Sequence, residues 1–315
     1  RCCFCADDRH LTDIVDHGHI DHFLRVAIDQ GLDPVIAIRM ATLNAAERFR
    51  LHDRGAIAPG KRADLVVFTD LDDIRPALIF SGGRLVAQDD EPVGDWHEPT
   101  VDETTVRNTV NVDWSNIGES TFHIPAAGDQ ARVIGAIEGQ VTTEHRIERI
   151  ARDKGLAVAD VERDILKMAV IERHRGTGNA GLGFVQGFGL QKGALAGSVA
   201  NDHHNIVTIG ADDQSMLTAA RAVGEMGGGF VVAKQERVLA QLPLPIAGLM
   251  SDQSVNAVRD AMDTLLINSA DLGSAVHDPF MAMAFMALEV IPSLKLTDQG
   301  LVDVEQFKPV KLFVE

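Results

Sequence analysis

Two adjacent carboxylates, Asp7 and Asp8, follow an apolar segment at the start of the sequence, and a histidine-bearing helix is predicted after them. The apolar residues 1–6 are typical of a strand buried in a protein core. A carboxylate at the mouth of such a strand, with no neighbouring lysine, is costly unless it binds metal or transfers protons. Because the sequence begins inside this expected core strand, we predict the C-terminal part of a larger metal-dependent enzyme.

A simpler explanation of both carboxylates is that they cap the helix that follows. From the residues alone, capping is the favoured explanation. His19 and His22 have helical spacing, which indicates a solvated or capping role and not a ligand pair.

The composition restricts the class of partner. A length of 315 residues allows two or more domains, and 45% hydrophobic residues are ordinary for a globular protein. The formal net charge of -17 argues against nucleic acid or an anionic membrane surface as partner. No signal peptide or membrane-length apolar run is visible, so we expect a cytoplasmic location.

All three cysteines, Cys2, Cys3 and Cys5, fall in the first five residues. Three crowded cysteines cannot crosslink a fold of this length, which indicates a reducing compartment. No fourth ligand follows at zinc-finger spacing, so we predict cysteines buried in a strand.

The first half of the sequence alternates between element types. A helix is predicted over residues 19–30, with Gly31 as its C-cap, and Asp33-Pro34 opens the next helix. Strand followed by helices fits the tail of an α/β barrel. Residues 51–90 predict a small β-sandwich portion. A turn-rich segment over 55–64, in which Asp64 anchors the turn, leads into a strand over 65–68. A hairpin of residues 77–80 and 84–87 follows.

A separate α/β (α+β) domain is predicted from residue 107, after a linker over 91–106 that is rich in Asp, Glu, Pro and Thr. Its helices are expected over 216–226 and 255–272. Its predicted strands are 132–137, 166–171, 194–199, 206–209 and 230–233.

The most polar group between two apolar strands is Asp202, His203, His204 and Asn205. Loops joining strands concentrate binding groups, so this loop is a candidate substrate-binding or lid segment. A polar hairpin connection is an equally good explanation. A metal site shared with Glu172, His174 or His277 ranks third. The glycine-rich residues 176–183 lack the Lys-Ser/Thr ending of a phosphate-binding loop, so we predict a turning connection there.

Several motifs in sequence order together resemble the bacterial adenine deaminase family of the amidohydrolase superfamily, over essentially the whole chain. The early motifs cover residues 5–10, 18–21 and 40–46, and residues 55–64 are widespread among amidohydrolases. The late motifs are the most specific: residues 172–174, 187–190, 201–205, 242–251, 278–281 and 296–303.

The resemblance implies a (β/α)8 barrel whose last strand and following helices are residues 1–50, with a β-sandwich portion over 51–90. It implies a family-specific domain over 107–315. Asp7 matches the aspartate of the superfamily's last barrel strand, which binds metal and relays protons. Asp8, Arg9 and His10 would support it. Ala6 and Leu11 stand where the family usually has threonine and proline, which puts in doubt how Asp7 is held.

The implied activity is hydrolytic deamination of adenine to hypoxanthine and ammonia, in purine salvage. The implied cofactor is a divalent metal, expected as a binuclear site of manganese or iron, with zinc as an alternative. The implied partners are adenine, the N-terminal half of the same enzyme and further copies in a homo-oligomer. The alternatives are another amidohydrolase acting on an aminopurine or cyclic amide, and a non-catalytic binding or assembly subunit.

Overall fold

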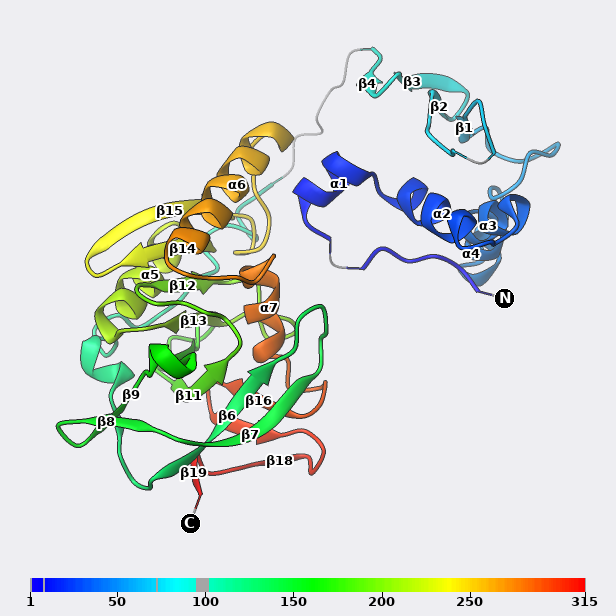
Figure 1. The fold of residues 1–315 in the computed structure, drawn as a ribbon. Helices are drawn as coiled ribbons and strands as arrows, with labels where there is room; N and C mark the ends of the chain where they lie inside the picture. Colours follow the sequence, from blue (N-terminus) through cyan, green and yellow to red (C-terminus); the bar gives the residue numbers. More distant parts are fainter. Residues whose placement is uncertain (1, 8, 72, 95–101, 315) are drawn as a thin grey trace. The chain divides into compact units, whose positions relative to one another are not determined.

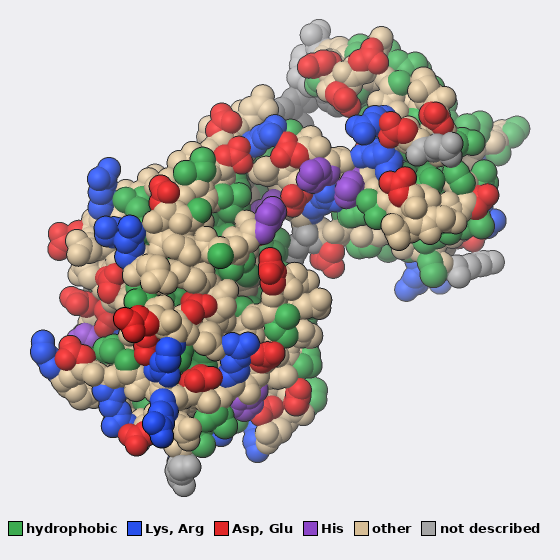
Figure 2. Space-filling view, viewed as in Figure 1, with side chains coloured by type: hydrophobic (Ala, Val, Ile, Leu, Met, Phe, Trp, Pro, Cys, Tyr) green, Lys and Arg blue, Asp and Glu red, His purple; other side chains and the backbone are tan. Residues whose placement is uncertain are grey.

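The computed structural model describes residues 2–7, 9–71, 73–94 and 102–314 (Figure 1). The chain divides into two compact units, Arg1–Val101 and Asp102–Glu315. Both contain helices and sheets, so the fold is mixed α and β. Among the described residues, every helix is too short or too polar to cross a membrane. On the face in Figure 2, acidic side chains are interspersed with basic ones.

Four helices open the first unit, and their ends follow local capping chemistry. The predicted helix over 19–30 is confirmed as α2, and Gly31 follows it with a φ of +93°. Asp33 caps α3 by accepting a hydrogen bond from the Ile36 amide at 3.0 Å, and Pro34 occupies the first helical position, as predicted. The helices are α1 (Leu11–His17), α2 (Ile20–Asp29), α3 (Pro34–Ala41) and α4 (Leu43–Arg48).

The prediction of a buried strand at the start of the chain is wrong. Residues 2–6 form no strand, and Cys2, Cys3 and Cys5 are exposed. A strand needs a neighbour to pair its backbone groups. Within the described part of the first unit, the strands pair only with one another, in a sheet formed by residues 65–92.

The predicted hairpin of the first unit is confirmed. An antiparallel sheet has the order β1-β2-β3-β4, and Gly82 and Gly83 form the turn between β2 and β3. Asp64 anchors a different turn from the predicted one at 55–64, because its Oδ1 accepts a hydrogen bond from the amide of Gly82, in the turn between β2 and β3, at 2.8 Å. The strands are β1 (Leu65–Val67), β2 (Leu78–Ser81), β3 (Arg84–Gln88) and β4 (Glu91–Pro92). Of the predicted linker, residues 95–101 lie outside the described residues.

A nine-stranded sheet forms the centre of the second unit. Its order is β15-β14-β12-β13-β10-β11-β6-β19, with β7 also paired to β6. Neighbouring strands of this sheet pair antiparallel, except that β11 and β6 pair parallel, which is the α+β arrangement. The strands are β6 (Gln130–Ala136), β7 (Thr143–Arg149), β10 (Ile165–Ile171), β11 (Ala180–Gln186), β12 (Ala194–Gly197), β13 (Ile206–Gly210), β14 (Gly229–Lys234), β15 (Arg237–Pro243) and β19 (Phe313–Val314).

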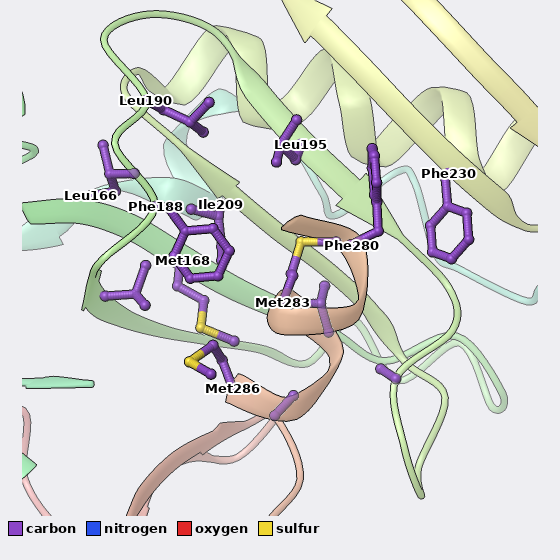
Figure 3. Packing of buried hydrophobic residues seen from close by; sticks show 14 of the residues in the cluster. Leu166, Met168, Phe188, Leu190, Leu195, Ile209, Phe230, Phe280, Met283 and Met286 are labelled. Atoms are coloured by element: carbon purple, nitrogen blue, oxygen red, sulfur yellow. The ribbon is translucent and has the colours of Figure 1, made fainter. Parts of the chain in front are cut away.

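Both faces of this sheet are covered, which explains why every residue of β10 is buried. Alternate residues of β10 enter two separate cores: Met168 packs on one face and Ala169 on the other. Helix α5 (Asp213–Glu225) covers the Ala169 face, while α6 (Val255–Asp271) and α7 (Pro279–Met286) cover the Met168 face. Figure 3 shows side chains of α7 packed near Met168 and Phe188. Met283 and Met286 are buried in this core.

The glycine-rich residues 176–183 were predicted as a turning connection, which is wrong for their second half. Residues 180–186 form β11, a strand inside the main sheet. A Cβ built on Gly181 would lie 1.9 Å from the Thr297 carbonyl oxygen. Glycine is needed at this position because another backbone approaches it closely.

Two smaller sheets complete the second unit. One has the order β16-β17-β18 and the other β5-β9-β8. Their strands are β5 (Ile124–Pro125), β8 (Ala151–Asp153), β9 (Leu156–Val158), β16 (Leu294–Thr297), β17 (Gly300–Asp303) and β18 (Lys308–Pro309).

Candidate functional site

The predicted catalytic segment lies at the start of the first unit. Asp7 is exposed and has a φ of +51°, a left-handed conformation that is uncommon for a residue with a side chain. Asp8 lies outside the described residues. Arg9 donates a hydrogen bond to the Asp13 carbonyl at 3.3 Å, and its guanidinium lies 5.2 Å from the centre of the Phe23 ring. His10 is half-buried immediately before α1.

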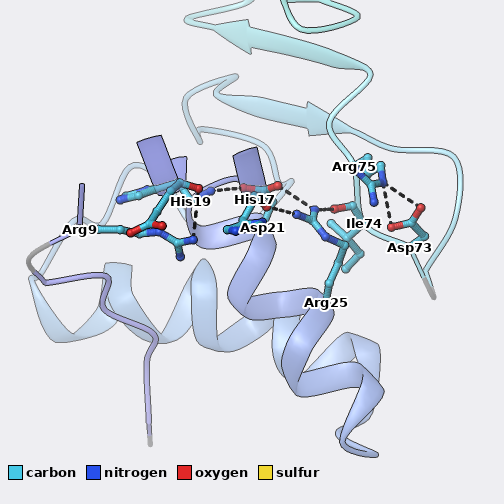
Figure 4. A network of polar contacts seen from close by, with 9 residues as sticks. Arg9, His17, His19, Asp21, Arg25, Asp73, Ile74 and Arg75 are labelled. Atoms are coloured by element: carbon cyan, nitrogen blue, oxygen red, sulfur yellow. Dashed lines mark hydrogen bonds and ion pairs between the residues drawn. The ribbon is translucent and has the colours of Figure 1, made fainter. Parts of the chain in front are cut away.

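A polar network around Arg25 fixes the helices that follow Asp7 (Figure 4). Arg25 donates hydrogen bonds to Asp21 at 2.7 Å, to the Ile74 carbonyl at 2.8 Å and to the His17 carbonyl at 2.5 Å. Burial would raise the pKa of Asp21, but hydrogen bonds from Arg25 and the His19 amide lower it below its ordinary value. The network therefore holds an ionised carboxylate between α1, α2 and residue 74.

The second unit gathers polar side chains where β10 ends beside the start of β13. Antiparallel pairing places Ile171 opposite Ile206, so the residues after Ile171 face those before Ile206. Two turns contact these residues: the turn at 246–250 through the Ala247 carbonyl, and the turn between β16 and β17 through Asp298. We call this group the polar cluster: Glu172, Arg173, His174, His203, His204, Asn205 and Asp298.

Glu172 organises the loop that follows β10. Its side-chain oxygens accept hydrogen bonds from the amides of His174 (2.5 Å), Arg175 (2.8 Å) and Thr177 (3.0 Å), and from the Thr177 hydroxyl (3.1 Å). Burial would raise the pKa of Glu172, but these hydrogen bonds lower it below its ordinary value. An ionised, 7% exposed carboxylate therefore holds the loop.

Arg173 is a buried cation that is held by main-chain carbonyls. Its residue is 1% exposed, and its guanidinium donates to the carbonyl oxygens of His204 and, at 3.1 Å, Ala247. Its Nη1 has no hydrogen-bond partner among the described residues. Burial lowers the pKa of Arg173 to about 10, which leaves it charged at neutral pH. Arg173 thus joins the 201–205 loop to the turn at 246–250.

The hydrogen-bonding groups of the predicted loop are largely engaged within the unit. Nδ1 of His203 accepts from the Asn205 amide at 3.0 Å, so Nε2 carries the proton and donates to the Ala287 carbonyl at 3.0 Å. The Asn205 side chain accepts from the Arg173 amide at 3.3 Å and approaches Asp298 at 3.5 Å. Burial lowers the pKa of both His203 and His204, which favours the neutral rings. Asp202 is exposed.

These contacts favour the hairpin-connection interpretation of residues 202–205. The loop joins β12 to β13, which pair as neighbouring antiparallel strands. His277, one of the residues considered for a metal site, lines a cavity that contains none of the polar-cluster residues. The described residues contain no group of three or more His, Cys, Asp or Glu side chains that could hold a metal. The substrate-binding role of the loop stays a prediction.

Gly248→Ala is expected to destabilise the protein more than Gly227→Ala. Both glycines are left-handed, with φ of +72° and +79°, so both variants incur about 1–2 kcal/mol of backbone strain. At Gly248 the new Cβ would also lie 2.4 Å from Nη1 of Arg173, whereas at Gly227 the nearest atom is 3.8 Å away. Displacing the buried cation adds about 2 kcal/mol. Urea unfolding of both variants measures the difference, and equal losses would contradict this role of Arg173.

Comparison with known proteins agrees with the two-unit organisation. Residues 2–110 match the amidohydrolase family, and residues 140–308 match the adenine deaminase C-terminal domain. An adenine deaminase of Desulfatibacillum aliphaticivorans is 49% identical over 99% of this chain and 54% of its own length. Adenine deaminase 2 of Carboxydothermus hydrogenoformans is 44% identical over 98% of this chain and 54% of its own length. An adenine deaminase of Oleidesulfovibrio alaskensis is 47% identical over 98% of this chain and 53% of its own length.

The chain thus spans about half the length of these relatives. The resemblance inferred from the motifs is confirmed, because all of the late motifs fall within the second match. Since that match covers more than half of the chain, the chain belongs to the adenine deaminase C-terminal domain family.

Proposed function

We propose that this chain is the C-terminal portion of a metal-dependent adenine deaminase, which converts adenine and water to hypoxanthine and ammonia. The observation that carries the proposal is the match of residues 140–308 to the adenine deaminase C-terminal domain. The three relatives that align along nearly the whole chain are named adenine deaminases, which supports the same activity.

Asp7 is proposed as the catalytic carboxylate of this chain. Amidohydrolases generally use divalent metal, and a bound metal lowers the pKa of water so that hydroxide forms near neutral pH. A carboxylate oxygen is a suitable ligand for such an ion. Asp7 would take the proton of the attacking water and return it to the ammonia that leaves C6. The remaining ligands would come from the half of the relatives' length that this chain does not cover.

The finer domain assignments belong to the same proposal. Residues 1–50 would complete the barrel, residues 51–90 would form part of a β-sandwich, and residues 91–106 would link them to the C-terminal domain over 107–315. The four helices followed by a small antiparallel sheet support this order. A binuclear manganese or iron site, a homo-oligomer, a cytoplasmic location and a role in purine salvage are proposed from the family resemblance. Arg9 and His10 would support Asp7, while Asp202 is the exposed candidate for a substrate contact.

The direct test uses the full-length enzyme. We expect equal amounts of hypoxanthine and ammonia from adenine, loss of both products after chelation, and recovery when manganese is added. Guanine and hydantoin, as another aminopurine and a cyclic amide, are the comparison substrates. Turnover of either in preference to adenine, or no product from adenine in the presence of metal, would contradict the proposal.

A further inference from the structure

A cavity of about 440 Å³ lies in the second unit, and none of its lining residues belongs to the polar cluster. Its walls are the end of β6 with residues 137–141, the turn at 187–189, and residues 275–278 with α7. Two motifs on which the family resemblance rests, residues 187–190 and 278–281, contribute to these walls and take no part in the polar cluster. We propose that this cavity binds an uncharged aromatic heterocycle of nucleobase or nucleoside size and excludes its phosphorylated forms.

Hydrogen bonds fix the walls of the cavity. Both oxygens of the Asp164 carboxylate are engaged, accepting from the Gly187 amide at 2.8 Å and the Gly189 amide at 2.7 Å. Lys295 is fully buried, and its ammonium donates to the carbonyls of Val141 at 3.0 Å and Phe285 at 2.7 Å. Because Val141 and Phe285 lie on different walls, Lys295 ties these walls together. The cavity is therefore formed in advance of any ligand, as small-molecule sites usually are.

The surface of the cavity suits a flat apolar ring. Met281, Phe285 and Met286 line it from α7, and Val276 lines it from the segment before that helix. Methionine sulfur and aromatic side chains pack favourably against aromatic rings. Small-molecule sites range from about 300 to 1,000 Å³, so the cavity is large enough for a nucleoside.

The charges around the cavity decide which ligands are excluded. Three carboxylates, Glu138, Asp164 and Asp278, line it together with one histidine, His277. None of the lining residues, all of which the structure describes, is a lysine or an arginine. A phosphate group would meet carboxylates with no lysine or arginine side chain on the cavity surface to pair with it, and an uncharged ring avoids this repulsion.

Adenosine and AMP are the matched probes, because they differ only by the phosphate. The choice of purines rests on the proposed function, but the exclusion of anions rests on the charges alone. Isothermal titration of the 315-residue chain should give a Kd below about 1 mM for adenosine and at least tenfold weaker binding of AMP. The measurement needs no deaminase activity. Absence of binding alongside an active full-length enzyme would overturn only this inference, and binding alongside an inactive one would overturn only the proposed function.

Two variants with matched controls locate the site. Ala282→Trp places a large ring into the cavity from α7 and should weaken adenosine binding at least about tenfold. Ala257→Trp makes the same change at an exposed position of α6 and should not. Glu138→Lys should strengthen AMP binding about fivefold, while Glu225→Lys, on the exposed end of α5, should leave it unchanged.

Three results would overturn the proposal. The first is that adenosine does not bind at several millimolar. The second is that adenosine and AMP bind with equal affinity, and the third is that Ala282→Trp leaves adenosine binding unchanged. If Ala282→Trp unfolds the protein, the Glu138→Lys variant at the exposed rim still tests the site. Loss of adenosine binding as the chain concentration rises would show that a second copy fills the cavity, and would also overturn it.

Discussion

Asp7→Asn in the full-length enzyme is expected to lower kcat for adenine deamination by about 10³-fold, within the range for loss of a general acid–base group. Asparagine keeps the size of the side chain and one oxygen, but it cannot accept the proton of water at neutral pH. It is also a weaker metal ligand than a carboxylate. Steady-state kinetics and metal analysis of the purified variant measure both effects.

Asp29→Asn is the matched control, because Asp29 is an exposed aspartate at the end of α2. It should leave kcat and metal content unchanged. The left-handed φ of +51° at Asp7 predicts a further result, since asparagine tolerates this conformation better than most residues. The variant should therefore fold normally. Activity equal to that of the unmodified enzyme would remove Asp7 from the mechanism.

Local signals in the sequence predicted the elements that depend on local chemistry. Asp33-Pro34 marked the start of α3 because capping and proline geometry act within one turn. Gly82-Gly83 marked the hairpin for the same reason. The strand predicted over residues 166–171 is confirmed as β10, because a largely apolar run of this length is typical of a buried strand.

Features that depend on distant segments were not predicted. The exposure of Cys2 and Cys5 follows from the absence of a paired strand in the described part of their unit, which no local pattern reveals. The strand β11 was missed because its glycines favour turns, whereas the backbone near Thr297 requires Gly181. The strand β7 was missed as well, because Ile147 is its one hydrophobic residue and the segment therefore shows no alternating apolar pattern.

The assembly of the polar cluster also depends on distant segments and was therefore not predicted. Glu172-Arg173-His174 and residues 201–205 were recognised as separate motifs. Their meeting depends on β10 pairing with β13 in a register that places Ile171 opposite Ile206. The charged triplet that directly follows seven buried residues was the available signal that this strand ends at a polar site. It could not show that Arg173 binds carbonyls and not a carboxylate.

Glu172→Ala is expected to lower the free energy of unfolding by about 4 kcal/mol, because three loop amides and the Thr177 hydroxyl lose their acceptor. Glu172→Gln should lower the free energy of unfolding by less, about 2 kcal/mol. The remaining side-chain oxygen of glutamine still accepts hydrogen bonds from the loop, but the new NH2 group cannot accept any and lies against donors. Glu225→Ala, at an exposed position of α5, should have little effect. Urea unfolding at pH 7 measures all three.

The pH dependence of the unfolding free energy distinguishes the contribution of the Glu172 charge from the contribution of its packing. Its pKa is lower in the folded protein than its ordinary value of 4.5, so the unfolded chain binds the proton more readily. The stabilisation is therefore fully present above pH 4.5 and is lost as the pH falls through the lower, folded-state pKa. The difference in unfolding free energy between wild type and Glu172→Gln should be constant above pH 4.5 and shrink below it. A difference that stays constant down to acid denaturation would show that Glu172 acts through packing alone.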